Sequence, residues 1–195
     1  MLIERIELVG PRISLQPLAA SHLPGLATAI RDGKLWELEV TLVPHPDDLG
    51  AFLADADSQF AAGRELAFAV IDLASQSVVG STRFRNISAH DLRVEIGFTF
   101  YARSWQRTYV NTHAKYLMLR HAFETWGANR VELGTDVLNT ASRAAIARIG
   151  AREEGILRSH MIMRGGRVRD SALSSMIRAE WPQAKQSLIR RMLAR

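Results

Sequence analysis

The chain has 195 residues, of which 47% are hydrophobic and 23% charged, and its formal net charge at pH 7 is +5. This length and composition predict one folded domain over residues 1–195, with enough apolar side chains for a proper core. The lack of cysteine excludes disulfides, thiolate nucleophiles and Cys-ligated zinc, and no apolar run approaches the roughly 18 residues of a membrane-spanning helix.

The N-terminal third predicts an edge strand and two helices. Ile6–Pro17 has the pattern of an edge strand, interrupted at Gly10, and Ser21–Arg31 is expected to be a helix capped by Ser21. A second helix is predicted over Asp47–Gly63. The segment Lys34–Pro46 between them predicts a loop with one short helical turn, of the kind that lines substrate entrances.

The rest of the chain predicts a mixed α/β fold. Strands are predicted at 66–72, 78–87, 92–101, 130–135, 155–163 and 168–178, and helices at 110–126, at 139–149 and from 180 onward. The strands on either side of the helix at 110–126 should be parallel, because a helical crossover joins them. We therefore expect a largely antiparallel, twisted sheet of about seven strands, flanked by helices, with one parallel pair that splays around a central helix.

The stretch Val94–Asn111 is where a strand runs into this central helix. Its period-two alternation places Glu95 on the face opposite Phe98. The first backbone N–H groups of the following helix have no partner within the helix, and the positive pole of the helix dipole lies at the same end. This corner is therefore a natural phosphate site. If the two parallel strands splay apart beyond it, a wedge opens next to that site.

Eight short motifs, taken in this order, resemble the GNAT superfamily of acetyl-CoA-dependent N-acetyltransferases. The resemblance is strongest to its RimJ/RimL branch, which acetylates the N-termini of ribosomal proteins, and it extends over most of the chain. The motifs are E-I-G-F at 95–98, W-Q-R-T-Y-V-N-T-H-A-K at 105–115, H-A-F-E at 121–124, N-R-V-E-L at 129–133, N-T-A-S-R at 139–143, G-A-R-E-E-G at 150–155, R-V-R-D at 167–170 and E-W-P at 180–182.

The resemblance implies that acetyl-CoA (coenzyme A) binds in the wedge. The family pattern Gln/Arg-x-x-Gly-x-Gly/Ala corresponds here to Gln106-x-x-Tyr109-x-Asn111, so the glycines that let the backbone close on phosphate are replaced. Backbone N–H donation survives any side chain, and binding then requires Tyr109 to point away from the phosphates, with Arg107 as a charge partner. The implied cofactor contacts are Phe98, Thr99 and Phe100 for the pantetheine, Gln106, Arg107, Thr108, Tyr109, Val110, Asn111 and Thr112 for the pyrophosphate, and Asn139 and Ser142.

Two residues are candidates for the chemistry of acetyl transfer. Glu95 is the candidate general base, and the competing interpretation is that it forms an ion pair with an arginine across the sheet, such as Arg93 or Arg83. Many family members have a tyrosine that acts as the general acid, and this chain has Ile146 at that position. The resemblance implies instead that Ser142 donates a hydrogen bond to the leaving thiolate. Ser142 is also an ordinary first-turn helix residue, and Asn139 an ordinary N-cap.

These features predict an acetyl-CoA-dependent N-acetyltransferase that acts on a primary amine, either a protein N-terminus or a small molecule, by direct transfer in a ternary complex. Acceptor choice is assigned to Leu35–Pro46 and to the hairpin at Arg164–Arg169. One rival is a catalytically degenerate acyl-CoA-binding or regulatory module, suggested by the missing glycines and tyrosine. Another is a ribosome- or nucleic-acid-associated protein that binds through its basic surface.

The sequence also predicts a cytoplasmic protein, a monomer or homodimer, with no membrane association. Its six histidines lack the spacing of known metal-binding motifs, so no metal site is expected.

Overall fold

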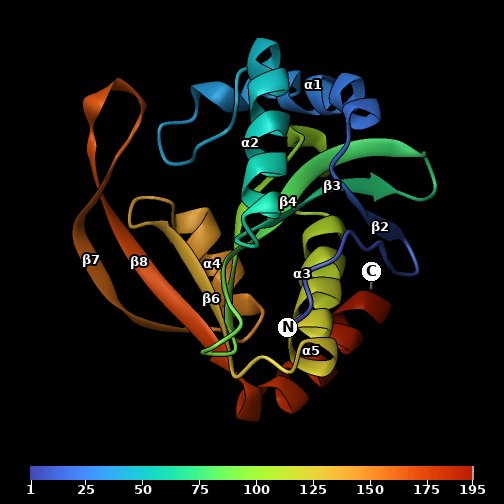
Figure 1. The fold of residues 1–195 in the computed structure, drawn as a ribbon, viewed down its shortest axis with the longest axis vertical. Helices are drawn as coiled ribbons and strands as arrows, with labels where there is room; N and C mark the ends of the chain where they lie inside the picture. The colour runs from blue at the N-terminus through green and yellow to red at the C-terminus, as the bar shows by residue number, and fades with distance from the viewer. Residues whose placement is uncertain (195) are drawn as a thin grey trace.

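The computed structural model describes residues 1–194 and contains one eight-stranded sheet, ordered β1-β2-β3-β4-β5-β6-β8-β7 (Figure 1). Every neighbouring pair is antiparallel except β5 and β6, which are parallel. The predicted fold class is therefore confirmed. The strands are β1 Leu8–Val9, β2 Ile13–Pro17, β3 Leu66–Asp72, β4 Ser77–Ser88, β5 Arg93–Tyr101, β6 Arg130–Asp136, β7 Arg152–Ile162 and β8 Val168–Ile177.

Helices cover both faces of this sheet (Figure 1). The apolar residues of α1 and α2 form one core with β3 and with Phe100 of β5. Those of α3 and α5 form a larger core on the opposite face, which includes Val94 and Ile96 of β5. The helices are α1 Leu23–Arg31, α2 Leu49–Ala61, α3 Val110–Arg120, α4 Thr140–Arg148 and α5 Trp181–Leu193, and a π-helical turn at His121–Thr125 continues α3.

Two local expectations near the N-terminus are wrong in detail. The edge strand predicted over Ile6–Pro17 is two strands, because the chain turns at Gly10, whose N–H donates to the Ile13 carbonyl oxygen (2.9 Å). The first helix does not begin at Ser21. Residues Ala20–His22 form a 3₁₀ turn, and α1 starts at Leu23 with a proline in its first turn, a position that proline favours.

Candidate active site

A wedge opens between β5 and β6 because their pairing is short. They pair only where Arg93, Val94 and Glu95 meet Arg130, Val131 and Glu132. Beyond those residues, β5 stays paired with β4 as far as Tyr101, and β6 stays paired with β8 as far as Asp136. The facing edges of 96–101 and 133–136 therefore carry backbone N–H and C=O groups that the sheet leaves unpaired. Such groups need partners, and an extended ligand with amide groups would supply them.

A β-bulge in β5 lies on one side of this wedge. Gly97 pairs with Arg83 and Phe100 pairs with Ser81, so Phe98 and Thr99 together oppose a single residue of β4. Phe98 has a positive φ of 45°, which is uncommon for a residue other than glycine. Bulges are frequent beside active sites because they release backbone groups from the ladder and redirect side chains.

The bulge also changes the direction of the Phe98 side chain. The Arg85 guanidinium carbon lies 4.0 Å from the Phe98 ring centroid, and the same arginine contacts Glu95. Glu95 and Phe98 therefore share one face of the sheet, and the prediction that they lie on opposite faces is wrong. The reason is that the extra residue in β5 interrupts the alternation on which the prediction depended.

Thr99 points to the opposite face, where it meets a buried lysine that sequence reasoning missed. The Nζ of Lys115, on α3, donates to Thr99 Oγ1 (2.8 Å), which in turn lies 2.7 Å from Thr82 Oγ1. Lys115 is 6% exposed, and burial lowers its pKa to about 7. Its place in the sequence gives no signal of this, since lysine within a helix is ordinarily exposed.

The corner that precedes α3 is held by side-chain contacts. Gln106 donates to the Tyr101 carbonyl oxygen (3.1 Å), and Thr108 donates to the Trp105 carbonyl oxygen (2.7 Å). The first turn of α3 carries no acidic residue, and its N-cap Tyr109 makes no side-chain cap. No carboxylate of the first turn therefore neutralises the positive end of the helix dipole, which suits an anionic ligand.

The Tyr109 side chain points from this corner toward β2 and β3. Its hydroxyl donates to the carboxylate of Asp72 at the end of β3, and the Arg12 guanidinium carbon lies 3.3 Å from its ring centroid. The ring also packs edge-on against Trp105. These contacts place the bulky ring against the antiparallel part of the sheet, on the side of the corner away from β6.

Glu95 lies beside the wedge with two polar partners. Its Oε1 lies 3.4 Å from Arg85 Nη1, and its Oε2 accepts a hydrogen bond of 2.6 Å from Asn86 Nδ2. The competing interpretation, an ion pair between Glu95 and an arginine across the sheet, is confirmed in kind, but the partner is Arg85 and not Arg93 or Arg83. Those arginines pair elsewhere, Arg93 with Asp91 and Glu132, and Arg83 with Asp55 and Glu65.

Two glycines keep the space around the Glu95 carboxylate clear. A Cβ added at Gly97 would lie 2.9 Å from Glu95 Oε1, and one added at Gly134 would lie 3.8 Å from the same atom. The carboxylate therefore lies next to a glycine on each of the two strands that border the wedge, Gly97 on β5 and Gly134 on β6.

The start of α4 holds the other predicted residues. Asn139 caps the helix, because its Oδ1 accepts from the Ser142 backbone N–H (2.9 Å). The Ser142 hydroxyl is half-buried and makes no hydrogen bond to residues 1–194. Ile146, at the position of the family tyrosine, is buried in the core.

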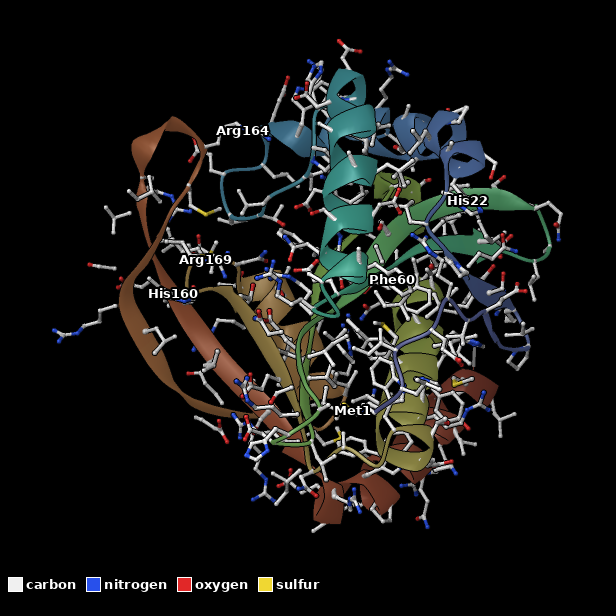
Figure 2. The ribbon with its side chains drawn as sticks, viewed as in Figure 1. Met1, His22, Phe60, His160, Arg164 and Arg169 are labelled. Atoms are coloured by element: carbon white, nitrogen blue, oxygen red, sulfur yellow. The ribbon has the colours of Figure 1, made fainter. Side chains whose placement is uncertain are left out.

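The two segments predicted to select the acceptor are in contact. Arg164, in the turn between β7 and β8, donates to the carbonyl oxygens of Trp36 (2.5 Å) and Val43 (2.9 Å). Arg167 donates to the Glu39 carbonyl oxygen (2.7 Å) and pairs with the buried Asp136. Figure 2 shows Arg164 at the end of the hairpin, next to the loop between α1 and α2.

Within residues 1–194, no group of three or more His, Asp or Glu side chains is arranged to hold a metal ion. None of the helices in that range combines the length and the apolar character that crossing a bilayer requires.

Comparison with known proteins identifies the family. The model of the acetyltransferase (GNAT) domain matches residues 12–152. No curated protein sequence matches the chain. A GCN5-related N-acetyltransferase from Brucella melitensis is 31% identical, with a TM-score of 0.85 over 96% of this chain and 85% of that one. A GNAT-family protein from Chromobacterium violaceum is 30% identical, with a TM-score of 0.81 over 92% and 89% of the two chains.

A more distant likeness shows the same fold. The RimJ protein of Mycobacterium smegmatis, solved in complex with CoA-disulfide, is 23% identical, with a TM-score of 0.78 over 92% of this chain and 88% of that one. The family match covers more than half of the sequence. The chain therefore belongs to the GNAT family and is an acetyltransferase that uses acetyl-CoA.

Proposed function

We propose that the enzyme transfers the acetyl group to a primary amine, with donor and acceptor bound together. The observation that carries this proposal is the position of Glu95, which lies on the same sheet face as the bulged residue Phe98 and beside the wedge. A carboxylate there can accept the proton that the acceptor amine must lose before it attacks. The acceptor is either a protein N-terminus, as the likeness to RimJ suggests, or a small-molecule amine.

The groups that border the wedge support the binding of acetyl-CoA there. The unpaired backbone edge at Phe98, Thr99 and Phe100 would bind the amides of the pantetheine. The turn from Gln106 to Thr112 would bind the pyrophosphate through backbone N–H groups at the start of α3. Asn139 and Ser142 flank the other side of the wedge, at the start of α4. Acetyl-CoA, when bound there, supplies the thioester that is the acetyl donor.

Three groups of the chain would act on the reacting atoms. Glu95 accepts the proton from the amine, and the backbone N–H of the bulge at Phe98 stabilises the negative charge that develops on the carbonyl oxygen. The Ser142 hydroxyl, which has no other hydrogen bond to residues 1–194, donates to the departing thiolate. The acetyl group passes directly to the amine, and the chain has no cysteine thiol that could carry it as a thioester intermediate.

The test is release of free thiol from acetyl-CoA in the presence of a panel of primary amines. We expect turnover with at least one amine, and a loss of about 10²- to 10⁴-fold in kcat for Glu95→Gln with unchanged binding of coenzyme A. Glu153→Gln is the control, because Glu153 is an exposed residue of β7 that pairs with Arg143 of α4 and has no proposed role in the reaction. Coenzyme A binding without transfer to any amine would favour a catalytically degenerate module, and a lack of both would reject the proposal.

A further inference from the structure

A second bulge, in β7, is not explained by the binding of acetyl-CoA. Leu157 pairs with Ser171 and Met161 pairs with Arg169, so three residues of β7 oppose Asp170 alone. The middle one, Ser159, has a positive φ of 52°, and its N–H donates to Asp170 Oδ1 (2.7 Å). A left-handed conformation of this kind is strained for serine, and such strain is common at functional sites.

This bulge brings His160 to the side chains of β8. His160 Nδ1 lies 3.0 Å from Ser171 Oγ, and the same oxygen accepts a hydrogen bond of 2.9 Å from Arg169 Nε. Figure 2 shows His160 and Arg169 where the two strands of the hairpin cross. Ser171 is 1% exposed, so the hydrogen bond that orients the Arg169 guanidinium is made to a buried side chain.

Arg169 lies on the face of the sheet that carries Glu95. Ser171 pairs with Asp136 of β6, and residues 134 and 136 of β6 point to the same face because side chains alternate along a strand. Position 134 is the glycine next to the Glu95 carboxylate. The series Glu95, Gly134, Asp136 and Arg169 therefore crosses the sheet on one face, from the candidate base to the hairpin.

The guanidinium of Arg169 lies within ion-pair distance of no carboxylate among residues 1–194. Its Nε binds Ser171, and within residues 1–194 its terminal nitrogens make no hydrogen bond or ion pair. Arg85 and Arg167, on the same face, each pair directly with a carboxylate. Burial holds the pKa of Arg169 below its usual value, although the more distant Asp136 and Glu95 raise it. Its positive charge is thus incompletely compensated.

We propose that Arg169, oriented by Ser171 and His160, binds a carboxylate group of the acceptor while the acceptor's amine lies at Glu95. The proposal rests on the proposed function and narrows its acceptor to amines that carry a carboxylate. A guanidinium edge with two free nitrogens matches the two oxygens of a carboxylate. Asp136 and Glu95, which act on Arg169 only through space, repel a doubly charged phosphate more strongly than a singly charged carboxylate. Free amino acids and peptides with an acidic first residue share this chemistry.

The experiment uses acceptors in matched pairs that differ only in the charge of one group. Glycine, β-alanine and 4-aminobutyrate are each compared with the corresponding amide, which varies the distance between amine and carboxylate. The peptide Asp-Ala-Ala-amide is compared with Asn-Ala-Ala-amide, in which the side-chain carboxylate is absent. Each pair is measured by thiol release and by calorimetric titration of the protein loaded with coenzyme A, which requires no turnover.

We expect at least one carboxylate acceptor to exceed its amide by about 10-fold or more in kcat/KM or in affinity. Arg169→Gln should abolish this preference with little change for the amide. Arg169→Lys, which retains the charge without the planar fork, should keep part of it. Arg158→Gln is the matched control, because Arg158 belongs to the same bulge but is exposed. A preference within the amino-acid pairs would indicate a free amino acid as acceptor, and a preference within the peptide pair would indicate a peptide.

Equal use or equal binding of both members of every pair by the wild-type protein would overturn the proposal. So would equal losses for carboxylate and amide acceptors in Arg169→Gln, which would indicate a purely structural role. Either result is compatible with acetyl transfer to an amine that carries no carboxylate, so the proposed function would survive. Failure of the proposed function would appear separately, as the absence of transfer to any amine.

Discussion

The Tyr109 hydroxyl donates a hydrogen bond to the Asp72 carboxylate and thereby joins the N-cap of α3 to the end of β3. The resemblance to the GNAT sequence pattern aligns Tyr109 with a phosphate-loop glycine, so a bulky ring would be expected to interfere there. The ring instead packs under Arg12, and Asp72 is also bound by the backbone and hydroxyl of Ser75. At this corner, a side chain that is fixed to the sheet by Asp72 and Arg12 therefore stands in place of a flexible glycine.

Tyr109→Phe should destabilise the protein without weakening cofactor binding. The variant removes a hydrogen bond to a buried carboxylate, for which we expect a loss of about 1–2 kcal/mol in the free energy of unfolding. The KM for acetyl-CoA should change by less than about 2-fold. Urea denaturation and steady-state kinetics measure the two effects. Tyr116→Phe serves as control, because the Tyr116 hydroxyl makes no hydrogen bond to residues 1–194. A large rise in KM would show that the Tyr109 hydroxyl contributes to the phosphate site.

Gly97→Ala should lower activity more than stability. The added Cβ would lie 2.9 Å from Glu95 Oε1 and 3.1 Å from Arg85 Cδ, so the ends of two flexible side chains must move. We expect about a 10-fold or greater loss in kcat, because small displacements of a catalytic group are costly, and a melting temperature close to that of the wild type. Gly155→Ala, in β7 and away from Glu95, is the matched control, since its Cβ would meet nothing within 4 Å. Equal activity of the two variants would contradict this role of Gly97.

Lys115→Met should flatten the dependence of stability on pH above neutrality. The pKa of Lys115 is about 7 in the folded protein, below its ordinary value of 10.5, because burial disfavours the charged form. Between these values the unfolded chain binds a proton that the folded protein does not. The contribution of Lys115 to stability is therefore present above the unfolded pKa and is lost as pH falls toward 7.

Wild-type stability should accordingly rise between pH 7 and 10 by up to about 1.4 kcal/mol per pH unit from this one group. The slope should be smaller by that amount in Lys115→Met, and the stability gain of the variant should be greatest at pH 7. Urea denaturation across this pH range measures both slopes. Lys185→Met is the control, because Lys185 forms an exposed pair with Glu124. Parallel curves for wild type and Lys115→Met would show that the lysine stays charged when buried.

Arg164→Gln should weaken acceptor binding selectively. Arg164 ties the hairpin between β7 and β8 to the carbonyl oxygens of Trp36 and Val43, so its loss frees the loop that borders the acceptor side. We expect the KM for the amine to rise several-fold and the KM for acetyl-CoA to stay unchanged, as steady-state kinetics with each substrate varied would show. Arg148→Gln, on the exposed side of α4, is the control. A matching rise in both KM values would mean that the contact supports the whole fold.

The sequence by itself determined most of the elements, their order and the parallel pair beside the central helix. Hydrophobic periodicity is local, and a helical crossover between two strands forces them to be parallel. The same local reasoning placed Glu95 next to a strand-to-helix corner, and Asn139 at a helix start. It also assigned acceptor choice to Leu35–Pro46 and to the hairpin at Arg164–Arg169, without showing that the two segments touch.

Only the tertiary structure decided where the side chains of the site point. The bulges at Phe98 and Ser159 depend on the register between strands, which period-two counting cannot supply. The one in β5 inserts a single extra residue and so reverses the faces of the residues that follow it. The partner of Glu95 and the direction of Tyr109 likewise depend on contacts between distant segments. The burial of Lys115 and the unpaired edge of Arg169 follow from the packing of whole elements, because local sequence pattern does not fix which distant groups surround a charge.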